Sequence, residues 1–416
     1  MTIFCIATYF KGEPFLREAH RLGATVLLLT ADSLANAAWP REAIVEIHTV
    51  ARDAGEAAIK RRVDEIARRH RIDRVAALDD FDVETGAMIR EHLQLSGIGR
   101  TTASRFRDKL AMRVAAREAG IAVPEFTATF NDEVVNQWTA RVPPPWVLKP
   151  RSSAAAIGIR KIGDRDGLWR ALHDAGDNRS NTVLEQFVAG DVYHVDSIVW
   201  NGSLVFAVAF KYGRPPMEIA HQGGLFITRR LEDHSEEGAA LLELNRRLQA
   251  MLGMQRGVSH SEFIRSGRPG GPGRPGGPGG PGGPGGPGRS GGSDLVFLET
   301  SARVGGAFIV DTIEAATGVN LWHEWARIEV GGGDYAVPPR RDDCSAIVLT
   351  LARQESPDMS AYVDREIVKT IRKEHHAGVI VSSPDPRRVD ALIAEYSTRF
   401  YRDFFATAPP PERPLE

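Results

Sequence analysis

Apolar and β-branched runs alternate with amphipathic segments along the N-terminal part of the chain. The pattern predicts, in chain order, strand Ile3–Thr8, helix Glu13–Leu22, strand Thr25–Thr30, a helix from about Ala54 to His70, strand Arg74–Leu78, and a helix that ends at about Leu93. A strand–helix–strand order of this kind is typical of a parallel α/β unit. The third strand ends at Asp79-Asp80.

The middle of the chain carries more strands. We predict a helix over Arg107–Gly120, followed by a break at Pro143-Pro144-Pro145. After the break, the pattern predicts strand Trp146–Lys149, a helix around Leu168–Ala175, and strands Thr182–Phe187, Val195–Val199 and Leu204–Phe210. The last two strands flank Asn201-Gly202, a strong hairpin signal. Past about Ile328 the pattern predicts strands near Ser345–Leu351 and Gly378–Ser382 and a helix near Arg387–Phe400.

A Gly- and Pro-rich segment of triplet repeats, residues 267–293, interrupts this pattern. Collagen has the same period, but a triple helix needs three chains and usually far more repeats, so we interpret the segment as a disordered insertion without chemistry. It separates strand Ser259–Ile264 from strand Leu295–Glu299. Because hairpin tips tolerate insertions, these two strands are expected to pair with each other.

Composition excludes several classes of protein. The chain has 416 residues and a net charge of −2, which gives no broad positive field for nucleic acid or an anionic membrane. Cys5 and Cys344 are its only cysteines, so a disulfide framework is excluded. Met1–Phe10 does not have the pattern of a secretory signal, and no apolar run approaches the ~18–20 residues that cross a bilayer. We therefore expect a cytoplasmic protein with neither nucleic-acid nor membrane partners.

Two clusters of polar residues stand at the ends of predicted strands. Lys149 ends one strand before a turn of small residues, 151–159, and an ammonium beside accessible backbone N–H groups suits phosphate. The alternative is an ordinary surface lysine. Glu185 lies near the end of the second strand, ahead of 190–196, an arrangement that suits a purine edge and ribose hydroxyls. The alternative there is an ordinary edge strand.

A third cluster lies on the two strands that flank the insertion. If those strands pair, Glu262 and Glu299 occupy adjacent positions on one face, which is unfavourable unless a cation lies between them. Mg²⁺ prefers such hard oxygen ligands and shares them with nucleotide phosphates. Arg303, two residues past Ser301, is placed to brace a phosphoryl oxygen or an oxyanion. A surface pair of salt-bridged acids is the alternative.

The order of these motifs resembles the ATP-grasp superfamily, specifically its carboxylate–amine ligases, which include amino-acid and dipeptide ligases. The resemblance spans roughly Ile3 to Gly318. It is carried by Asp79-Asp80, Arg-Asp-Lys-Leu-Ala-Met-Arg at 107–113, Ala-Gly-Ile-Ala-Val-Pro at 119–124, the Val-Leu-Lys-Pro strand, the Glu-Gln-Phe-Val hinge, and Glu-Thr-Ser-Ala-Arg-Val-Gly-Gly at 299–306.

This resemblance implies an ATP-grasp fold of the α/β and α+β classes. The implied division is a pre-ATP-grasp α/β domain at 1–105, a two-lobed ATP-binding core at 106–327, a small C-terminal α/β unit at 328–406, and a tail at 407–416.

The resemblance also implies a nucleotide site. ATP phosphates would be bound by Lys109 and Lys149 under a lid from Ser152 to Gly158, with Ser152, Ser153 and Gly158 as the contacts. The hinge residues Glu185, Gln186 and Val188 would face the adenine. Mg²⁺, or Mn²⁺ in its place, would be held by Glu262, Glu299 and Ser301, and the catalytic residues would be Arg303 and Lys149.

Three departures from the family pattern accompany these assignments. The lid has one glycine where relatives often have several, so the serine hydroxyls are expected to donate instead. Ser301 stands where Asn is usual. Val192 occupies the usual place of the ribose acid, and Asp191, one position earlier, is expected to substitute for it.

The implied activity joins a carboxylate, activated by ATP as an acyl phosphate, to an amine, with small molecules as both partners. An ATP-grasp small-molecule kinase and a non-catalytic nucleotide-binding scaffold are the alternatives. Arg214 or Arg229 is a candidate to pair with the substrate carboxylate, and His221 or His260 to position the amine. For each of the four, an ordinary loop residue is the alternative. A homodimer is compatible with the family.

Overall fold

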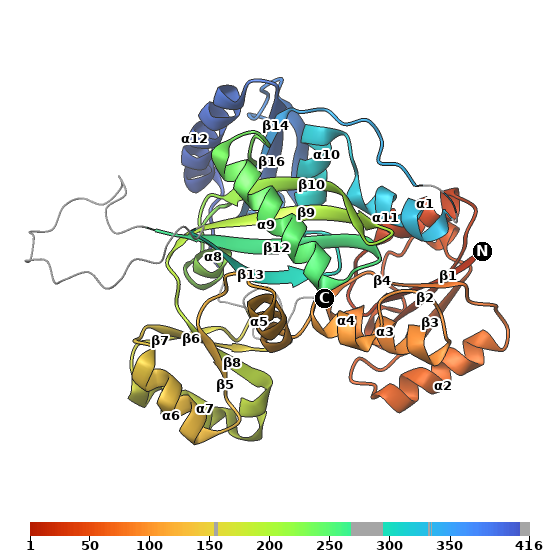
Figure 1. Ribbon diagram of the computed structural model, residues 1–416. Coiled ribbons are helices and arrows are strands. Elements are labelled where there is room, and N and C mark those ends of the chain that lie inside the picture. Colours follow the sequence, from red (N-terminus) through yellow and green to blue (C-terminus); the bar gives the residue numbers. More distant parts are fainter. Residues whose placement is uncertain (154–156, 268–293, 332, 334, 408–416) are drawn as a thin grey trace, which may run out of the picture.

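The computed structural model describes residues 1–153, 157–267, 294–331, 333 and 335–407. Three sheets organise this part of the chain. Figure 1 shows the N-terminal sheet at the lower right, a small lobe at the lower left, and a large sheet with its helices above both. The predicted insertion lies outside the described residues from 268 to 293, as do lid residues 154–156 and most of the predicted tail, 408–416.

The N-terminal unit is a parallel sheet of order β3-β2-β1-β4, which confirms the predicted α/β class. Its elements are β1 (Thr2–Ala7), α1 (Glu13–Arg21), β2 (Thr25–Ala31), β3 (Glu46–Val50), α2 (Glu56–Ala67), β4 (Arg74–Ala77), α3 (Val83–His92) and α4 (Arg100–Ser104). The two central strands, β1 and β2, are buried almost throughout. Helices therefore cover both faces of this sheet, as parallel sheets require.

The small lobe is an antiparallel sheet of order β5-β8-β6-β7 with two helices on one face. Its elements are β5 (Phe126–Ala128), α6 (Asp132–Arg141), β6 (Trp146–Pro150), β7 (Arg160–Ile162), α7 (Arg165–Ala175) and β8 (Thr182–Gln186). Along β6, Trp146 and Leu148 pack against the helices. Because side chains alternate along a strand, Val147 and Lys149 face the other way.

The large sheet has the order β13-β12-β9-β10-β11-β14-β16-β15 and is antiparallel. Its strands are β9 (Gly190–Trp200), β10 (Ser203–Tyr212), β11 (Phe226–Arg230), β12 (Arg256–Ser266), β13 (Leu295–Ser301), β14 (Cys344–Leu351), β15 (Ile367–Lys373) and β16 (His376–Ser383). The helices around it are α5 (Lys109–Glu118), α8 (Pro216–Gln222), α9 (Glu236–Leu252), α10 (Ile309–Thr317), α11 (Leu321–Val330) and α12 (Pro386–Asp403).

Both predicted hairpins of this sheet are present. Asn201 and Gly202, at the β9–β10 turn, have φ angles of 50° and 74°, which a two-residue hairpin of the primed type requires. Strands β12 and β13 pair across the insertion, with Arg265 opposite Leu295. The helix predicted over Arg107–Gly120 begins later, at Lys109, because the Asp108 carboxylate accepts the Leu110 N–H and caps the helix.

The C-terminal strands correct the predicted division of the chain. Strand β11 pairs with β14, so β14, β16 and β15 extend the sheet of the core instead of forming a separate unit at 328–406. The predicted start of that unit falls inside α11. The hydrophobic pattern does change past about Ile328, but strands from any part of the chain can pair with an open sheet edge. The local sequence therefore does not show which sheet a strand joins.

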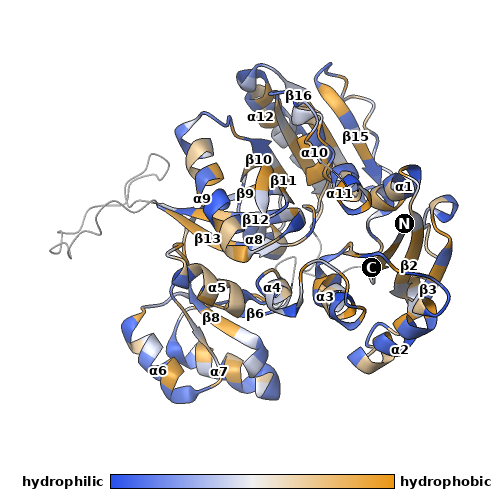
Figure 2. Cartoon of the chain, turned by 45° about the vertical axis from the view of Figure 1, so that its right-hand side comes forward, coloured by the Kyte–Doolittle hydropathy of each residue, from blue (hydrophilic) through white to orange (hydrophobic). Residues whose placement is uncertain are grey.

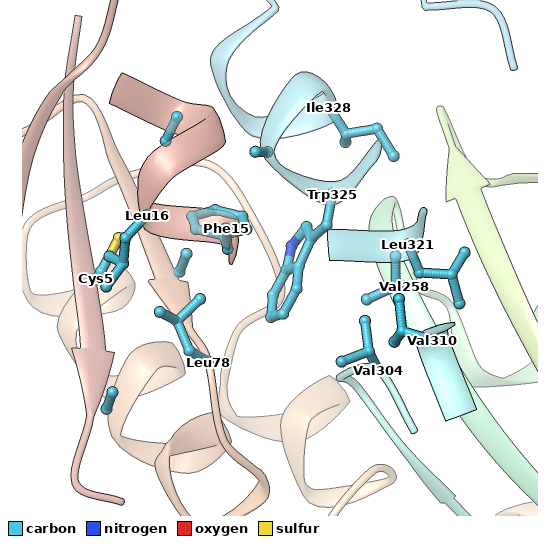
Figure 3. Packing of buried hydrophobic residues seen from close by; sticks show 14 of the residues in the cluster. Cys5, Phe15, Leu16, Leu78, Val258, Val304, Val310, Leu321, Trp325 and Ile328 are labelled. Atoms are coloured by element: carbon cyan, nitrogen blue, oxygen red, sulfur yellow. The ribbon is translucent and has the colours of Figure 1, made fainter. Parts of the chain in front are cut away.

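An apolar cluster joins the N-terminal unit to the core. Figure 3 shows Phe15 of α1 beside Trp325 of α11, with ring centroids 5.1 Å apart in an edge-on arrangement. Leu78 from one side and Val304 from the other belong to the same buried cluster. Figure 2 shows hydrophobic residues along strands such as β2 and β13, and a mixture of hydrophilic and hydrophobic residues along α2 and α7.

None of the described helices is both long and apolar enough to span a membrane.

Candidate active site

The three sheets border one cavity of about 710 Å³. Its wall includes the carboxyl edge of the N-terminal sheet, the exposed face of the small lobe, and β12 and β13 of the large sheet. Of the predicted site residues, it is lined by Lys109, Lys149, Ser153, Glu185, Gln186, Val188, His260, Glu262, Glu299, Ser301 and Arg303. Residues from distant parts of the sequence thus meet at one place of a size suited to small ligands.

Six predicted site residues are not part of the cavity wall. Ser152 offers its carbonyl to Arg107, and Gly158 follows the undescribed part of the lid, with a φ of 74°. Three others are engaged elsewhere: Asp191 with Lys211 (2.6 Å), Arg229 with Asp390 of α12 (2.5 Å), and Arg214 with Gln222 (3.1 Å). The sixth, His221, is exposed on α8.

A buried ion cluster occupies the small-lobe side of the cavity. Lys149 Nζ lies 2.9 Å from Glu185 Oε2, and Arg113 Nη2 donates to the same oxygen at 3.2 Å. Burial lowers the pKa of Lys149, while the Glu185 carboxylate opposes that shift. Burial would raise the pKa of Glu185, but the two cations outweigh it and hold that pKa below its ordinary value. The Glu185 carboxylate is therefore occupied by these two cations, while Gln186 and Val188 also line the cavity.

Arg113, which the sequence did not single out, lies behind the cavity wall and contacts Glu185 there. It lies four residues after Lys109 on α5, so both side chains project from one face of the helix. That spacing was a usable signal. Lys109 Nζ donates to the Ser153 carbonyl at 2.6 Å and lies 3.2 Å from Glu299 Oε2. The first turn of α5 therefore connects the base of the lid to the acidic strands.

Glu262 and Glu299 lie directly opposite each other on β12 and β13. The register shifts immediately beyond this pair, where Phe263 faces Phe297 and Leu298 is the extra residue of a bulge. The bulge lets Glu299 face the cavity, although Phe297 packs into the core. The Lys109 and Lys149 ammonium groups outweigh the effect of burial and lower the pKa of Glu299 to about 2. Two opposed carboxylates beside the Ser301 hydroxyl form a hard-oxygen donor set that fits Mg²⁺.

A chain of hydrogen bonds and one longer ion pair supports Glu262 on the side away from Glu299. Tyr212 donates to Glu262 Oε1 at 3.0 Å, and His260 Nε2 lies 3.6 Å from the same oxygen. His260 Nδ1 contacts Asp196 Oδ1 at 2.9 Å, and the other oxygen of Asp196 contacts His194 at 2.6 Å. Burial opposes a charge on His260, but Asp196 outweighs it and raises the pKa of His260 to about 9. These contacts hold Glu262 in one orientation.

Arg303 reaches the cavity between the core and the N-terminal unit. Its Nη1 donates to the Val304 carbonyl at 2.8 Å and its Nη2 to Asp80 Oδ2 at 3.3 Å. Burial would lower the pKa of Arg303, but the nearby carboxylates, Asp80 first among them, raise it. The guanidinium is therefore held charged at the cavity wall, beside Ser301.

The remaining end of the cavity is mostly apolar. It is formed by the edge of the N-terminal sheet, by α8 and by the start of β11, and is lined by Tyr9, Phe10, Lys11, Phe81, Met217, Ile219 and Phe226. Lys11 contributes the cation of this group and pairs with the buried Asp79 at 2.7 Å. The sequence did not predict this end, because its residues come from loops, α8 and β11, which share no motif.

Comparison with known proteins finds matches both in sequence and in structure. Residues 16–97 match the model of the ATP-grasp N-terminal domain. An L-arginine-specific L-amino acid ligase of Bacillus subtilis is 23% identical over 265 residues, covering 62% of this chain and 58% of the ligase. The match thus spans less than two thirds of that relative.

Solved structures match over nearly the whole chain. The L-amino acid ligase from Bacillus licheniformis superimposes with a TM-score of 0.71 at 17% identity, covering 98% of this chain and 99% of the ligase. The biotin carboxylase domain of Hydrogenobacter thermophilus 2-oxoglutarate carboxylase, solved with the magnesium salt of ADP and with bicarbonate, has a TM-score of 0.66 at 14% identity, covering 94% of this chain and 88% of that domain.

Proposed function

We propose, on the premise that this chain has the ATP-grasp fold, that it is an ATP-dependent carboxylate–amine ligase. The reaction would convert Mg·ATP, an acid and an amine into an amide or peptide bond, ADP and phosphate. One observation carries the proposal: the opposed Glu262 and Glu299 lie in the same cavity as Lys109, Lys149 and Arg303.

The residues of the cavity divide the work of such a reaction. Lys109 and Lys149 bind phosphate oxygens and neutralise their charge. Glu262, Glu299 and Ser301 would hold Mg²⁺, which would supply positive charge to offset the charge of the phosphates. Mn²⁺ has the same ligand preference and is included in the proposal.

Arg303 acts on the second half of the reaction. When the amine attacks the acyl phosphate, negative charge develops on the carbonyl oxygen, and a guanidinium held in place stabilises that charge. The walls of the cavity keep water from the acyl phosphate. Placing acid and amine beside the nucleotide supplies a large part of the acceleration.

Small molecules are the proposed substrates, and amino acids are the first class to test. The Bacillus subtilis relative is named for activity on L-arginine, and the Bacillus licheniformis structure is named for activity on L-amino acids. Cys5 and Cys344 are both buried free thiols, which suits the cytoplasm as the proposed compartment. A homodimer is also part of the proposal.

The proposal is tested by a screen for ADP and phosphate release over amino acids and small carboxylates, with products identified by mass spectrometry. We expect ADP release that needs both an acid and an amine, together with a product lighter than their sum by one water. Glu262→Gln is the matched control and should abolish release. A stable phosphorylated product formed without an amine would favour the kinase instead. Function that survives in cells carrying Glu262→Gln would favour the scaffold.

A further inference from the structure

Asp80, one residue of the Asp79-Asp80 pair that ends the N-terminal strand run, has no role in the proposed reaction so far. It begins the short 3₁₀ turn η3 (Asp80–Asp82) and is only 5% exposed. Its Oδ2 accepts from the Ser301 hydroxyl at 3.0 Å and from Arg303 Nη2 at 3.3 Å. One carboxylate oxygen of the N-terminal unit thus contacts both Ser301 and Arg303, two residues proposed to act on the nucleotide phosphates and the oxyanion.

The other oxygen of Asp80 faces the base of the lid. Oδ1 is buried and makes no hydrogen bond within the described part of the chain, and Arg107 Nη1 lies 3.9 Å away. Arg107 Nη2 in turn donates to the Ser152 carbonyl. A buried acceptor without a donor costs about 1–3 kcal/mol, so stability alone does not explain a carboxylate at this position.

The position of Asp80 is fixed from both sides of the domain boundary. Asp79 Oδ1 accepts the Phe81 N–H at 3.0 Å, which closes the turn, and the Phe81 ring lies 4.8 Å from the Arg107 guanidinium. Leu78 and Val304, which adjoin these segments on the two sides, belong to one apolar cluster (Figure 3). Domain packing therefore sets the distance between Asp80 and Arg303.

The direction of the hydrogen bond between Ser301 and Asp80 determines which way the Ser301 hydroxyl points. A carboxylate accepts and does not donate, so the Ser301 hydroxyl points its hydrogen at Asp80 and keeps its lone pairs for the cavity. An amide at position 80 would offer an N–H to Ser301 and would allow that hydroxyl to turn around. The charge of Asp80 likewise restrains the Arg303 guanidinium, whose other hydrogen bond runs to the Val304 carbonyl.

We propose that Asp80 is a positioning residue that aims Arg303 and the Ser301 hydroxyl at the γ-phosphate side of the cavity. The N-terminal unit then completes the proposed phosphate site and also forms part of the mostly apolar end of the cavity. This inference rests on the proposed function, because it assumes that a nucleotide triphosphate occupies the cavity.

Binding of two nucleotides tests the inference without knowledge of the acid or the amine. Affinities for Mg·ADP and for a Mg-bound ATP analogue with a non-hydrolysable β,γ-bond are measured by titration calorimetry. Their ratio reports recognition of the γ-phosphate. In Asp80→Asn, preference for the analogue should fall about 10–100-fold while the affinity for Mg·ADP stays within about twofold, in line with other positioning residues.

Two further variants separate positioning from general stability. Arg303→Met should lose the same preference, and the double variant should lose no more than either single one, because both changes remove one interaction. Glu329→Gln is the matched control. Glu329 is also a buried acid between the two units, beside Arg90 and Arg256, but it lies outside the cavity. Its variant should leave the ratio unchanged.

The outcomes are distinct. An unchanged ratio in Asp80→Asn, or losses that add in the double variant, would overturn the positioning role. If Asp80→Asn does not fold, Ser301→Ala and Arg303→Met must each lower the ratio, and an unchanged ratio in both would overturn the inference. A wild-type chain that binds neither nucleotide would instead overturn the proposed function and this inference with it.

Discussion

The two ends of the cavity are built differently. At the end where we propose that the nucleotide binds, called the nucleotide end, the charged groups are already paired with one another: Lys149 with Glu185, and Lys109 with Glu299. At the other end, where we propose that the substrates bind and which we call the substrate end, aromatic and aliphatic side chains from loops and α8 form most of the wall, with Lys11 and Asp79 as its close ion pair. The nucleotide end is organised by strand register and one helix turn, whereas the substrate end depends on how the domains dock.

The pKa values of the buried carboxylates also differ between the two ends. Nearby cations outweigh burial and lower the pKa values of Glu185 and Glu299. Beside the substrate end, burial raises the pKa of Asp82 to about 7, because the Thr8 hydrogen bonds only partly offset it. Cationic partners therefore decide which buried acids keep their charge. The following variants test this contrast, beginning with the largest expected effect.

Glu185→Gln should destabilise the protein by about 3–5 kcal/mol, because it leaves Arg113 and Lys149 as buried cations without a counter-charge. Urea unfolding without nucleotide measures the change. The exposed pair of Arg246 and Glu243 provides a comparison, since Glu243→Gln should leave the urea midpoint almost unchanged. Equal effects of the two variants would contradict the claim that the nucleotide end depends on its paired ions.

Glu299→Gln should slow ADP release by about 10²–10³-fold and raise the Mg²⁺ concentration needed for half-maximal rate, because one of two opposed metal-binding carboxylates is lost. The rate is followed as a function of Mg²⁺ with the best substrates from the screen. Glu218→Gln changes a carboxylate of α8 at the substrate end and should leave the Mg²⁺ midpoint in place. A shared shift would show that the two ends are not separate.

Asp82→Asn should remove a pH dependence of stability. The pKa of Asp82 rises from 3.8 to about 7 on folding, so the folded state retains a proton that the unfolded chain has lost, and stability falls as pH rises between these values. In the wild type, this group alone should lower the free energy of unfolding by about 2 kcal/mol from pH 5 to pH 7. Urea unfolding at both pH values should show a flatter profile in Asp82→Asn and no change in Asp53→Asn, which alters an exposed acid.

A crossed pair of truncations gives the smallest effects. Met217→Ala shortens a side chain at the substrate end and Ile159→Ala one at the nucleotide end. Each should weaken only its own ligand, by about 1 kcal/mol or roughly fivefold, as lost methylenes do in hydrophobic pockets. The KM of the acid or amine and the affinity for Mg·ADP are measured for both variants. Effects that cross over would break the division of the cavity.

The pairing of Glu262 with Glu299 was predictable from the sequence because its geometry is local. Strand alternation places Lys149 on the cavity face, and the hairpin brings Glu262 opposite Glu299. The substrate end was not predictable, because Lys11, Phe81 and Met217 meet only through domain docking. The proposed substrate residues Arg214, His221 and Arg229 were chosen for their chemistry and lie outside the cavity wall, so residue type without position was insufficient.

The hairpin of β12 and β13 has two places, its tip and its bulge, where the length of the chain can change without altering the strand pairing. Ser266 N–H donates to the Asp294 carbonyl at 3.0 Å, so the ladder is already closed where the Gly- and Pro-rich segment begins, and evolution or a protein engineer is free to lengthen or replace that segment. Loss of Leu298, the extra residue of the bulge, would make the ladder regular and keep Phe297 opposite Phe263 and Glu299 opposite Glu262. The hairpin therefore offers a fusion site at its tip and, at the bulge, a residue whose removal preserves the pairing of the two acids.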